Sequence, residues 1–217
     1  MAVDFVIRSE TVPAGSVGSV SSARLNKRQE LVMMPWEFSL GVEGRLFIAN
    51  RGVLTTPVAQ TNLTLTTLRP DMAVRVPSGT TIIPLRMEVY WEVTGAGVTE
   101  IMANVSSNDV GAGTSTAVTP VSLSPNSGRG TACIVARDYT ADCAALTSGT
   151  EFYRDGYPTD PDVAGNPAVR FVWSYLLHGA VPVLRGPASL MLATNNATSG
   201  SYFASISWAE FLTSELV

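Results

Sequence analysis

Histidine, lysine and cysteine are almost missing from this chain of 217 residues. It has one histidine, His178, and one lysine, Lys27, beside thirteen arginines and two cysteines. A Ser–His–Asp or Cys–His system would have to use His178, which ends an expected strand and has no nucleophile motif near it. One imidazole also cannot supply a metal site made of several histidines. We therefore expect no catalytic residues, no cofactor and no enzymatic activity.

Charged residues are also scarce. Only 15 % of the residues are charged, and fourteen basic against eighteen acidic side chains give a net charge of −4. This balance argues against strong direct binding of nucleic acid, which requires a basic stripe. The chain is nevertheless 46 % hydrophobic. An apolar chain with so few charges is expected to have part of its surface covered by partners.

Long apolar runs are missing as well. No stretch reaches the roughly 18 apolar residues of a membrane-spanning helix, so we expect no contact with a membrane. Residues 1–10 are interrupted by charged side chains and do not read as a secretory signal. Cys133 and Cys143 have no histidine nearby, which argues against a zinc site. Two buried free thiols are the favoured interpretation, and a disulfide is the alternative.

The clearest positive signal is the alternation of apolar and polar residues in short stretches. These stretches are separated by turns rich in Gly and Pro, and they predict about nine to eleven β-strands and very little helix. The pattern is typical of an antiparallel sandwich or barrel. Pro84 cannot donate a backbone hydrogen bond, so an edge or a bulge is expected there. The expected strands are 45–50, 62–68, 72–76, 82–93, 98–106, 116–123, 131–137, 168–178, 188–194 and 201–212.

Two further parts of the chain differ from this pattern. Residues 1–34 form an expected N-terminal arm with a short helix at 26–34 ended by Pro35, and residues 35–217 form the β-domain. Residues 138–167 look like a long excursion, with one helical turn near 141–146 followed by loop. Loops of this length are usually functional or lie at an interface.

Acidic residues offer one candidate ion site. Asp155, Asp160 and Asp162 lie in the sequence RDGYPTDPD and could supply oxygen ligands to Ca²⁺. The spacing is not that of an EF-hand, so a solvated loop without metal is the favoured interpretation. Glu88 and Glu92 fall on one face of an expected strand, where a structural ion pair with Arg86 or a neighbouring arginine is expected.

Aromatic residues divide into core and surface candidates. Trp91, Trp173 and Trp208 lie on the apolar faces of expected strands, which favours core packing over a sugar-binding surface. Three residues are predicted instead to lie at an interface. They are Trp36, which follows Pro35, and Phe203 and Phe211, on the face of strand 201–212 opposite to Tyr202, Ala204, Ile206 and Trp208.

Two longer stretches carry a family resemblance. VPSGTTIIPLRMEVYWEV is a turn followed by a long strand with a charged outer face, and GPASLMLATNNATSGSYFASISWAEF is a strand, a polar turn and a long closing strand. With the small-residue stretch 9–22, they resemble the jelly-roll virion proteins of viruses and tailed phages, and more distantly tumour-necrosis-factor-like trimers. The resemblance covers residues 45–217.

The resemblance implies a two-sheet jelly roll that associates with itself, as a trimer, and with other capsid proteins. The arm would reach a neighbouring subunit, and no catalytic residue is carried over. Residues 1–30 have a net charge of only +1, which favours a decorating subunit at the capsid surface over one that packages nucleic acid. The main alternative is a carbohydrate- or receptor-binding module with the acidic loop as its site, with or without Ca²⁺. A β-sandwich hydrolase ranks last.

Overall fold

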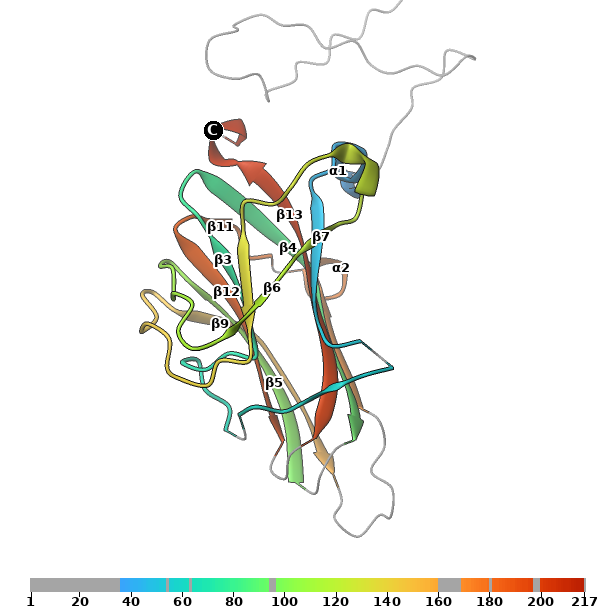
Figure 1. Cartoon of the computed structure of the whole chain (residues 1–217), viewed down its shortest axis with the longest axis vertical. Coiled ribbons are helices and arrows are strands. Elements are labelled where there is room, and N and C mark those ends of the chain that lie inside the picture. Colours follow the sequence, from blue (N-terminus) through green and yellow to red (C-terminus); the bar gives the residue numbers. More distant parts are fainter. Residues whose placement is uncertain are drawn as a thin grey trace, which may run out of the picture.

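The chain folds as a sandwich of two antiparallel sheets. A computed structural model describes residues 36–216 except 54, 63, 94–96, 160–168, 180 and 197–199. In this part the strands form one sheet of seven and one of six, packed against each other (Figure 1). The predicted all-β two-sheet sandwich is confirmed. The predicted arm, with its helix at 26–34, lies outside the described residues.

The first sheet has a continuous path of five strands and two short strands beside it. In spatial order the path is β10 (Val169–Ser174), β4 (Thr80–Val93), β13 (Ser201–Leu212), β1 (Leu46–Arg51) and β7 (Val121–Ser122), with β11 (Leu184–Arg185) on β4 and β2 (Val58–Ala59) on β13. The second sheet runs β6 (Thr116–Val118), β8 (Ile134–Arg137), β3 (Met72–Val76), β12 (Ala188–Asn196), β5 (Gly97–Ser106) and β9 (Thr150–Thr159). The helical segments are α1 (Trp36–Val42), η1 (Pro125–Ser127), α2 (Tyr175–His178) and η2 (Thr213–Glu215).

The strand pairing is nested from the ends of the chain inward. Among the eight strands β1, β3, β4, β5, β9, β10, β12 and β13, the first pairs with the last, β1 with β13. Then β3 pairs with β12, β4 with β10, and β5 with β9. This doubled-over hairpin, divided between two sheets, is the topology of a jelly roll.

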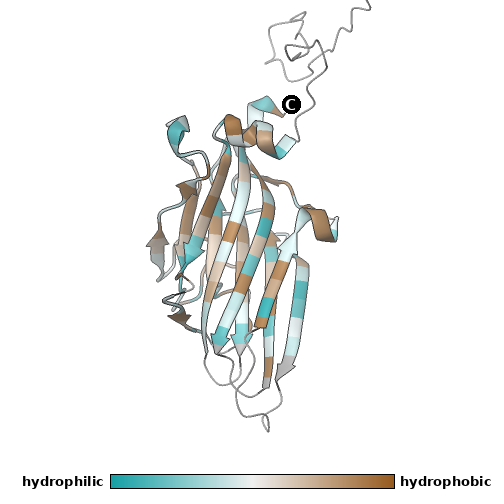
Figure 2. Cartoon of the chain, turned by 90° about the vertical axis from the view of Figure 1, so that its right-hand side faces the viewer, coloured by the Kyte–Doolittle hydropathy of each residue, from teal (hydrophilic) through white to brown (hydrophobic). Residues whose placement is uncertain are grey.

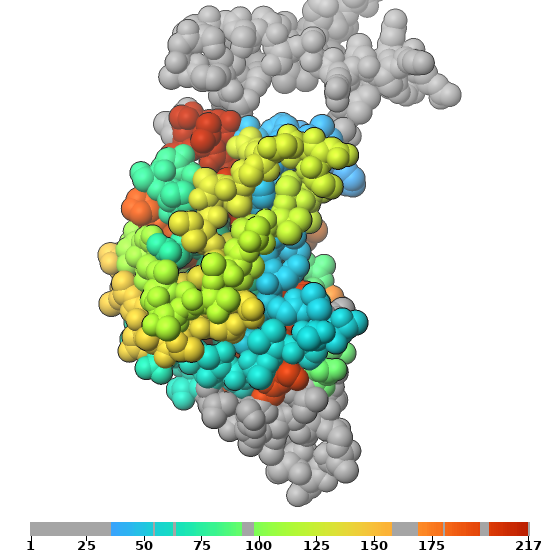
Figure 3. Space-filling view, viewed as in Figure 1, coloured from blue at the N-terminus to red at the C-terminus, as the bar shows by residue number. Residues whose placement is uncertain are grey.

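The segment between β5 and β9, residues 107–149, extends both sheets. It adds β7 to the β1 edge of the first sheet, and β6 and β8 to the β3 edge of the second. In Figure 3 this yellow-green segment spreads across the face of the molecule. The long excursion predicted at 138–167 is therefore misplaced. Its second half, predicted as loop, contains the ten-residue strand β9.

Three other local predictions are wrong. The described residues of 62–68, all but 63, form no strand, and the Leu68 amide donates to the Thr66 hydroxyl and not to a neighbouring strand. The strand predicted at 116–123 is divided at Pro120 into β6 and β7, which belong to different sheets. The helical turn predicted at 141–146 is irregular chain, because the Cys143 amide donates to the Leu68 carbonyl.

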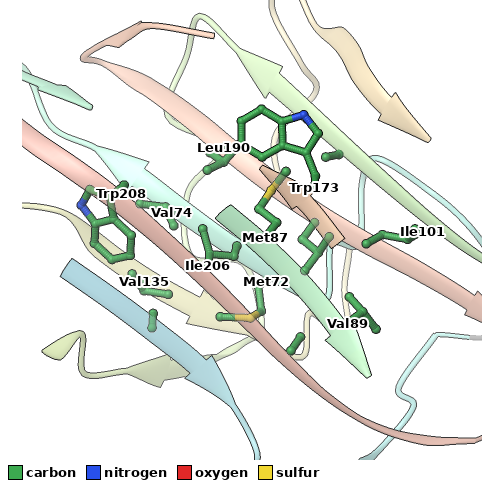
Figure 4. Close-up of a cluster of buried hydrophobic side chains, with 14 of the residues drawn as sticks. Met72, Val74, Met87, Val89, Ile101, Val135, Trp173, Leu190, Ile206 and Trp208 are labelled. Atoms are coloured by element: carbon green, nitrogen blue, oxygen red, sulfur yellow. The ribbon is translucent and has the colours of Figure 1, made fainter. Parts of the chain in front are cut away.

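The core lies between the sheets and contains the large aromatic side chains (Figure 4). Trp91, Trp173 and Trp208 are at most 1 % exposed, which confirms their predicted core positions. Cys133 and Cys143 are buried free thiols, as favoured from the sequence. Asn104, which begins an Asn-Val-Ser sequence of the type that is glycosylated in secreted proteins, is buried in β5.

Pro84 produces the predicted bulge. In the pairing of β4 with β13, Ser207 lies opposite Arg86 and Trp208 opposite Pro84, so Leu85 has no partner. Regular alternation would put Leu85 on the core face with Met87, but the extra residue leaves Leu85 only half-buried while Met87 stays inside.

A buried polar network connects the two sheets at the end where β1 stops. The fully buried guanidinium of Arg51 donates from Nε to Oδ1 of Asp138 at 2.6 Å and to the carbonyls of Val58 and Ala59. It also stacks on the ring of Tyr202, with 4.0 Å between its Cζ atom and the ring centroid. One arginine therefore holds β1, β2, β13 and the chain after β8 together.

Asp71 lies in the same network and is fully buried. Its Oδ2 accepts hydrogen bonds from the Thr194 amide at 2.6 Å and from the Thr194 hydroxyl at 3.1 Å. Its Oδ1 and the Tyr202 hydroxyl are also buried, and neither has a hydrogen-bond partner among the described residues. Burial raises the pKa of the Asp71 carboxyl to about 6, against the opposing effects of Tyr202 and of the positive charge on Arg51.

This raised pKa predicts an unusual pH dependence of stability. The folded protein holds the Asp71 proton more tightly than the unfolded chain, so the stabilisation is complete below pH 4 and is lost as pH rises through about 6. We expect the free energy of unfolding to increase by roughly 1 kcal/mol between pH 7.5 and pH 5, relative to the Asp71→Asn variant. Urea unfolding of both proteins at each pH measures this difference. Parallel pH profiles would contradict it.

Candidate functional site

The helix α1 comes before the first strand, where the sequence predicted β-structure. It begins directly after Pro35, a residue well suited to the start of a helix, and Glu37 is favourably placed in its first turn. It ends before Gly44, whose φ of 69° a side chain would strain. Leu40 is the buried residue that attaches the helix to the sandwich, and Phe38 and Val42 stay exposed.

The helix α2 replaces the end of a predicted strand. The sequence prediction continued strand 168–178 through His178, but β10 ends at Ser174. The Ser174 side chain accepts a hydrogen bond from the Leu177 amide, and Gly179 adopts a left-handed conformation with φ 68°. A serine cap and a glycine stop are ordinary helix signals, and they override the alternation here.

The two helices meet through an aromatic contact. Trp36 and Tyr175 lie edge to face with their ring centroids 5.5 Å apart. His178, at the end of α2, is exposed and its Nδ1 is 3.1 Å from the Ser174 carbonyl oxygen. The single histidine thus takes part in helix-end and ring contacts, its ring lying near those of Trp173 and Tyr153.

An apolar surface extends over both helices and the adjacent part of the first sheet. One groove, of about 740 Å³, lies between them, and a second, of about 420 Å³, lies on the other side of α1. Phe38 lines both grooves. We call this the α1/α2 surface, defined by Phe38, Val42, Leu46, Leu85, Leu123, Val172, Tyr175, Leu176 and Leu177.

The exposure of this surface is high. Leu176 and Leu177 are 76 % and 73 % exposed, and Phe38 and Val42 are comparable. Figure 2 shows the apolar brown colour on both helices, beside a sheet face that mixes apolar and polar residues. Charged side chains of both signs, Glu37 and Arg86, border the larger groove. An apolar centre with a mixed charged rim is the usual composition of a protein interface.

The three predicted interface residues are not all at this surface. Trp36, 41 % exposed, stands at its edge through the contact with Tyr175. Phe211 is half-buried on β13 beneath the guanidinium of Arg45, with 5.4 Å between Cζ and the ring centroid. Phe203 is half-buried on the outer face of the same strand, opposite Tyr90. Whether these three residues contact a partner stays a prediction.

The structure describes only part of the acidic stretch around Asp155, which the sequence spacing disfavours as a calcium site. Asp160 and Asp162 lie outside the described residues. Asp155 belongs to strand β9, where its carboxylate accepts hydrogen bonds from the Tyr153 hydroxyl and the Gly156 amide. In the part of the chain that the structure describes, no three His, Cys, Asp or Glu side chains cluster as metal ligands, and no helix is long and apolar enough to cross a membrane.

Sequence reasoning missed the residues that dominate the surface. Alternation through the expected strand 168–178 puts Leu177 on the same face as the core residue Trp173, and no pattern marks Phe38. The serine before Tyr175 and the glycine after His178 were the available signal, because they mark a single helical turn whose side chains leave the sheet. Phe38 had no comparable signal, since α1 has only seven residues.

Comparison with known proteins does not identify what this surface binds. No known protein family matches the chain, and no curated protein is significantly similar to it. The interpretation of the surface therefore depends on its chemistry and on the fold that carries it.

The contact between α1 and α2 gives a local prediction. Replacing Trp36 with Ala removes an edge-to-face ring pair, and we expect the free energy of unfolding to fall by about 1 kcal/mol. Trp36→Phe keeps a ring in place and should recover most of the loss. Chemical denaturation of the three proteins measures both effects. Equal stability of Trp36→Ala and the wild type would show that this contact does not hold the helices together.

Proposed function

We propose that this protein is a self-associating structural subunit of a virus particle, one that builds or decorates the outside of a capsid. The observation that carries the proposal is the α1/α2 surface, on which Phe38, Leu176 and Leu177 are more than two-thirds exposed. Isolated proteins rarely leave such a cluster in water, whereas subunits of assemblies bury it.

The fold supports the same proposal. The nested strand pairing is that of a jelly roll, an architecture used by viral capsid domains and also by lectins. Fold alone does not assign a function, so the weight rests on its combination with the apolar surface and with a chain that has one histidine. The net charge of −4 favours a position outside a shell, away from packaged nucleic acid.

The proposed partner at the α1/α2 surface is a second copy of this chain. The rim of the larger groove carries the carboxylate of Glu37 and the guanidinium of Arg86, so two copies can place opposite charges together around a shared apolar centre. The expected state is a trimer that also contacts other capsid proteins, in the virion.

Self-association can be tested by removing the exposed leucines. The double variant Leu176→Ser, Leu177→Ser should fold normally, because both side chains are in solvent in the single chain, and it should lose at least tenfold in association. Light scattering after size exclusion measures the mass against the 23.0 kDa of one chain. Val98→Ser, on an exposed position of the second sheet, is the control and should associate like the wild type.

Two results would contradict the proposal. A wild-type chain that stays a 23 kDa monomer at high micromolar concentration leaves the surface without a second copy. A protein that associates but is absent, by mass spectrometry and immunogold electron microscopy, from particles of its source virus is not a virion subunit.

A further inference from the structure

A row of three side chains crosses the outer face of the first sheet. Arg170 on β10 lies directly opposite Tyr90 on β4, and Tyr90 lies directly opposite Phe203 on β13. Each of the three is flanked along its strand by buried residues, so the alternation of a strand points all three outward. Neighbouring strands are about 4.8 Å apart, so the row is roughly 10 Å long.

Carboxylates stand above and below the central tyrosine. Glu88 and Glu92 are two residues away from Tyr90 on either side, on the same face of β4. Glu88 is held by two guanidinium groups, at 2.8 Å from Arg86 and 2.5 Å from Arg170. Glu92 is exposed and has no ion-pair partner among the described residues. A hollow of about 490 Å³ lies over Glu88, Tyr90, Glu92 and Arg170.

We infer that this row is a binding platform for a neutral glycan. A pyranose ring has an apolar C–H face, which stacks on an aromatic ring, and hydroxyl edges, which hydrogen-bond to planar carboxylate and guanidinium groups. Tyr90 and Phe203 supply two aromatic side chains about one strand spacing apart, and Arg170 and Glu92 supply the polar groups around them. The hollow has the volume of an ordinary small-ligand site.

The charges decide which class of sugar fits. Arg86 and Arg170 share the single carboxylate of Glu88, and Glu92 adds a second negative charge, so the four groups sum to zero. Both guanidinium charges are balanced by carboxylates, so the platform offers no net positive charge to a sialic acid or a sulfate, and the unpaired carboxylate of Glu92 repels both. The platform therefore selects uncharged sugars. It requires no metal ion, which separates it from the calcium site considered at Asp155, Asp160 and Asp162.

The site is independent of self-association, although the two surfaces adjoin at Arg170, which lines both hollows. The double variant Leu176→Ser, Leu177→Ser should therefore bind glycan as the wild type does. If it associates poorly and still binds sugar, the two functions are separate. Loss of both would overturn the independent platform inferred here.

The experiment is a printed array of neutral, sialylated and sulfated glycans, probed with the full-length protein with and without EDTA. We expect neutral glycans to be retained in both conditions. The best of them is then titrated in solution against variants. Tyr90→Ala should weaken binding about tenfold or more, Tyr90→Phe should stay within about threefold, and Val98→Ser should be unchanged.

A second variant controls for a loss of binding caused by misfolding. Glu92 is exposed, so Glu92→Gln should keep the wild-type melting temperature while weakening binding several-fold through the lost charged acceptor. The inference fails if no neutral glycan binds at millimolar concentration, if binding requires Ca²⁺, or if both Tyr90→Ala and Glu92→Gln bind like the wild type.

Discussion

The first sheet exists only because the last strand of the chain is inserted between two early ones. β13 pairs along its length with β4 on one side and with β1 and β2 on the other. Its inward side chains, including Trp208 and Ile206, are fully buried against the second sheet. Because the pairing joins residues far apart in the sequence, the fold has high contact order, and it is expected to form slowly and all at once. The grooves at α1 and α2 and the row through Tyr90 all depend on this insertion.

The sequence predicted the strands that alternate strongly and failed where another constraint decided. β3 and β13 have their predicted bounds, because each shows a sequence alternation that turn residues end on both sides, although burial in the structure extends to both faces of each strand. Even the bulge beside Pro84 followed from its missing N–H. β9 was missed because an edge strand pairs on one side only and so tolerates the glycine, proline and charges that read as loop. Its pairing is set by β5, which no local pattern reveals.

The candidate surfaces were also predictable in part, where strand alternation determines them, and unpredictable where the topology does. The charged outer face of β4 was predictable from alternation, and the expected ion pairs are confirmed for Glu88 but not found for Glu92 among the described residues. The row through Tyr90 was not predictable, because it depends on the register of three strands that are distant in the chain. The α1/α2 surface depends on helices of seven and four residues, too short to show a helical period. Sequence patterns describe each element well, but neighbours in space come from the topology.

The segment between β5 and β9 has a consequence for how copies of the chain can meet. By adding β7 to β1, and β8 and β6 to β3, it makes short strands of two and three residues the outermost ones along one side of both sheets. Such short edge strands offer little backbone for pairing with another chain, the route that leads to fibres and to exchanged strands. Contacts made through the sheet faces and helices exchange no strand, so each copy of the chain keeps its whole fold. Any assembly that uses them can come apart and form again while its subunits remain folded.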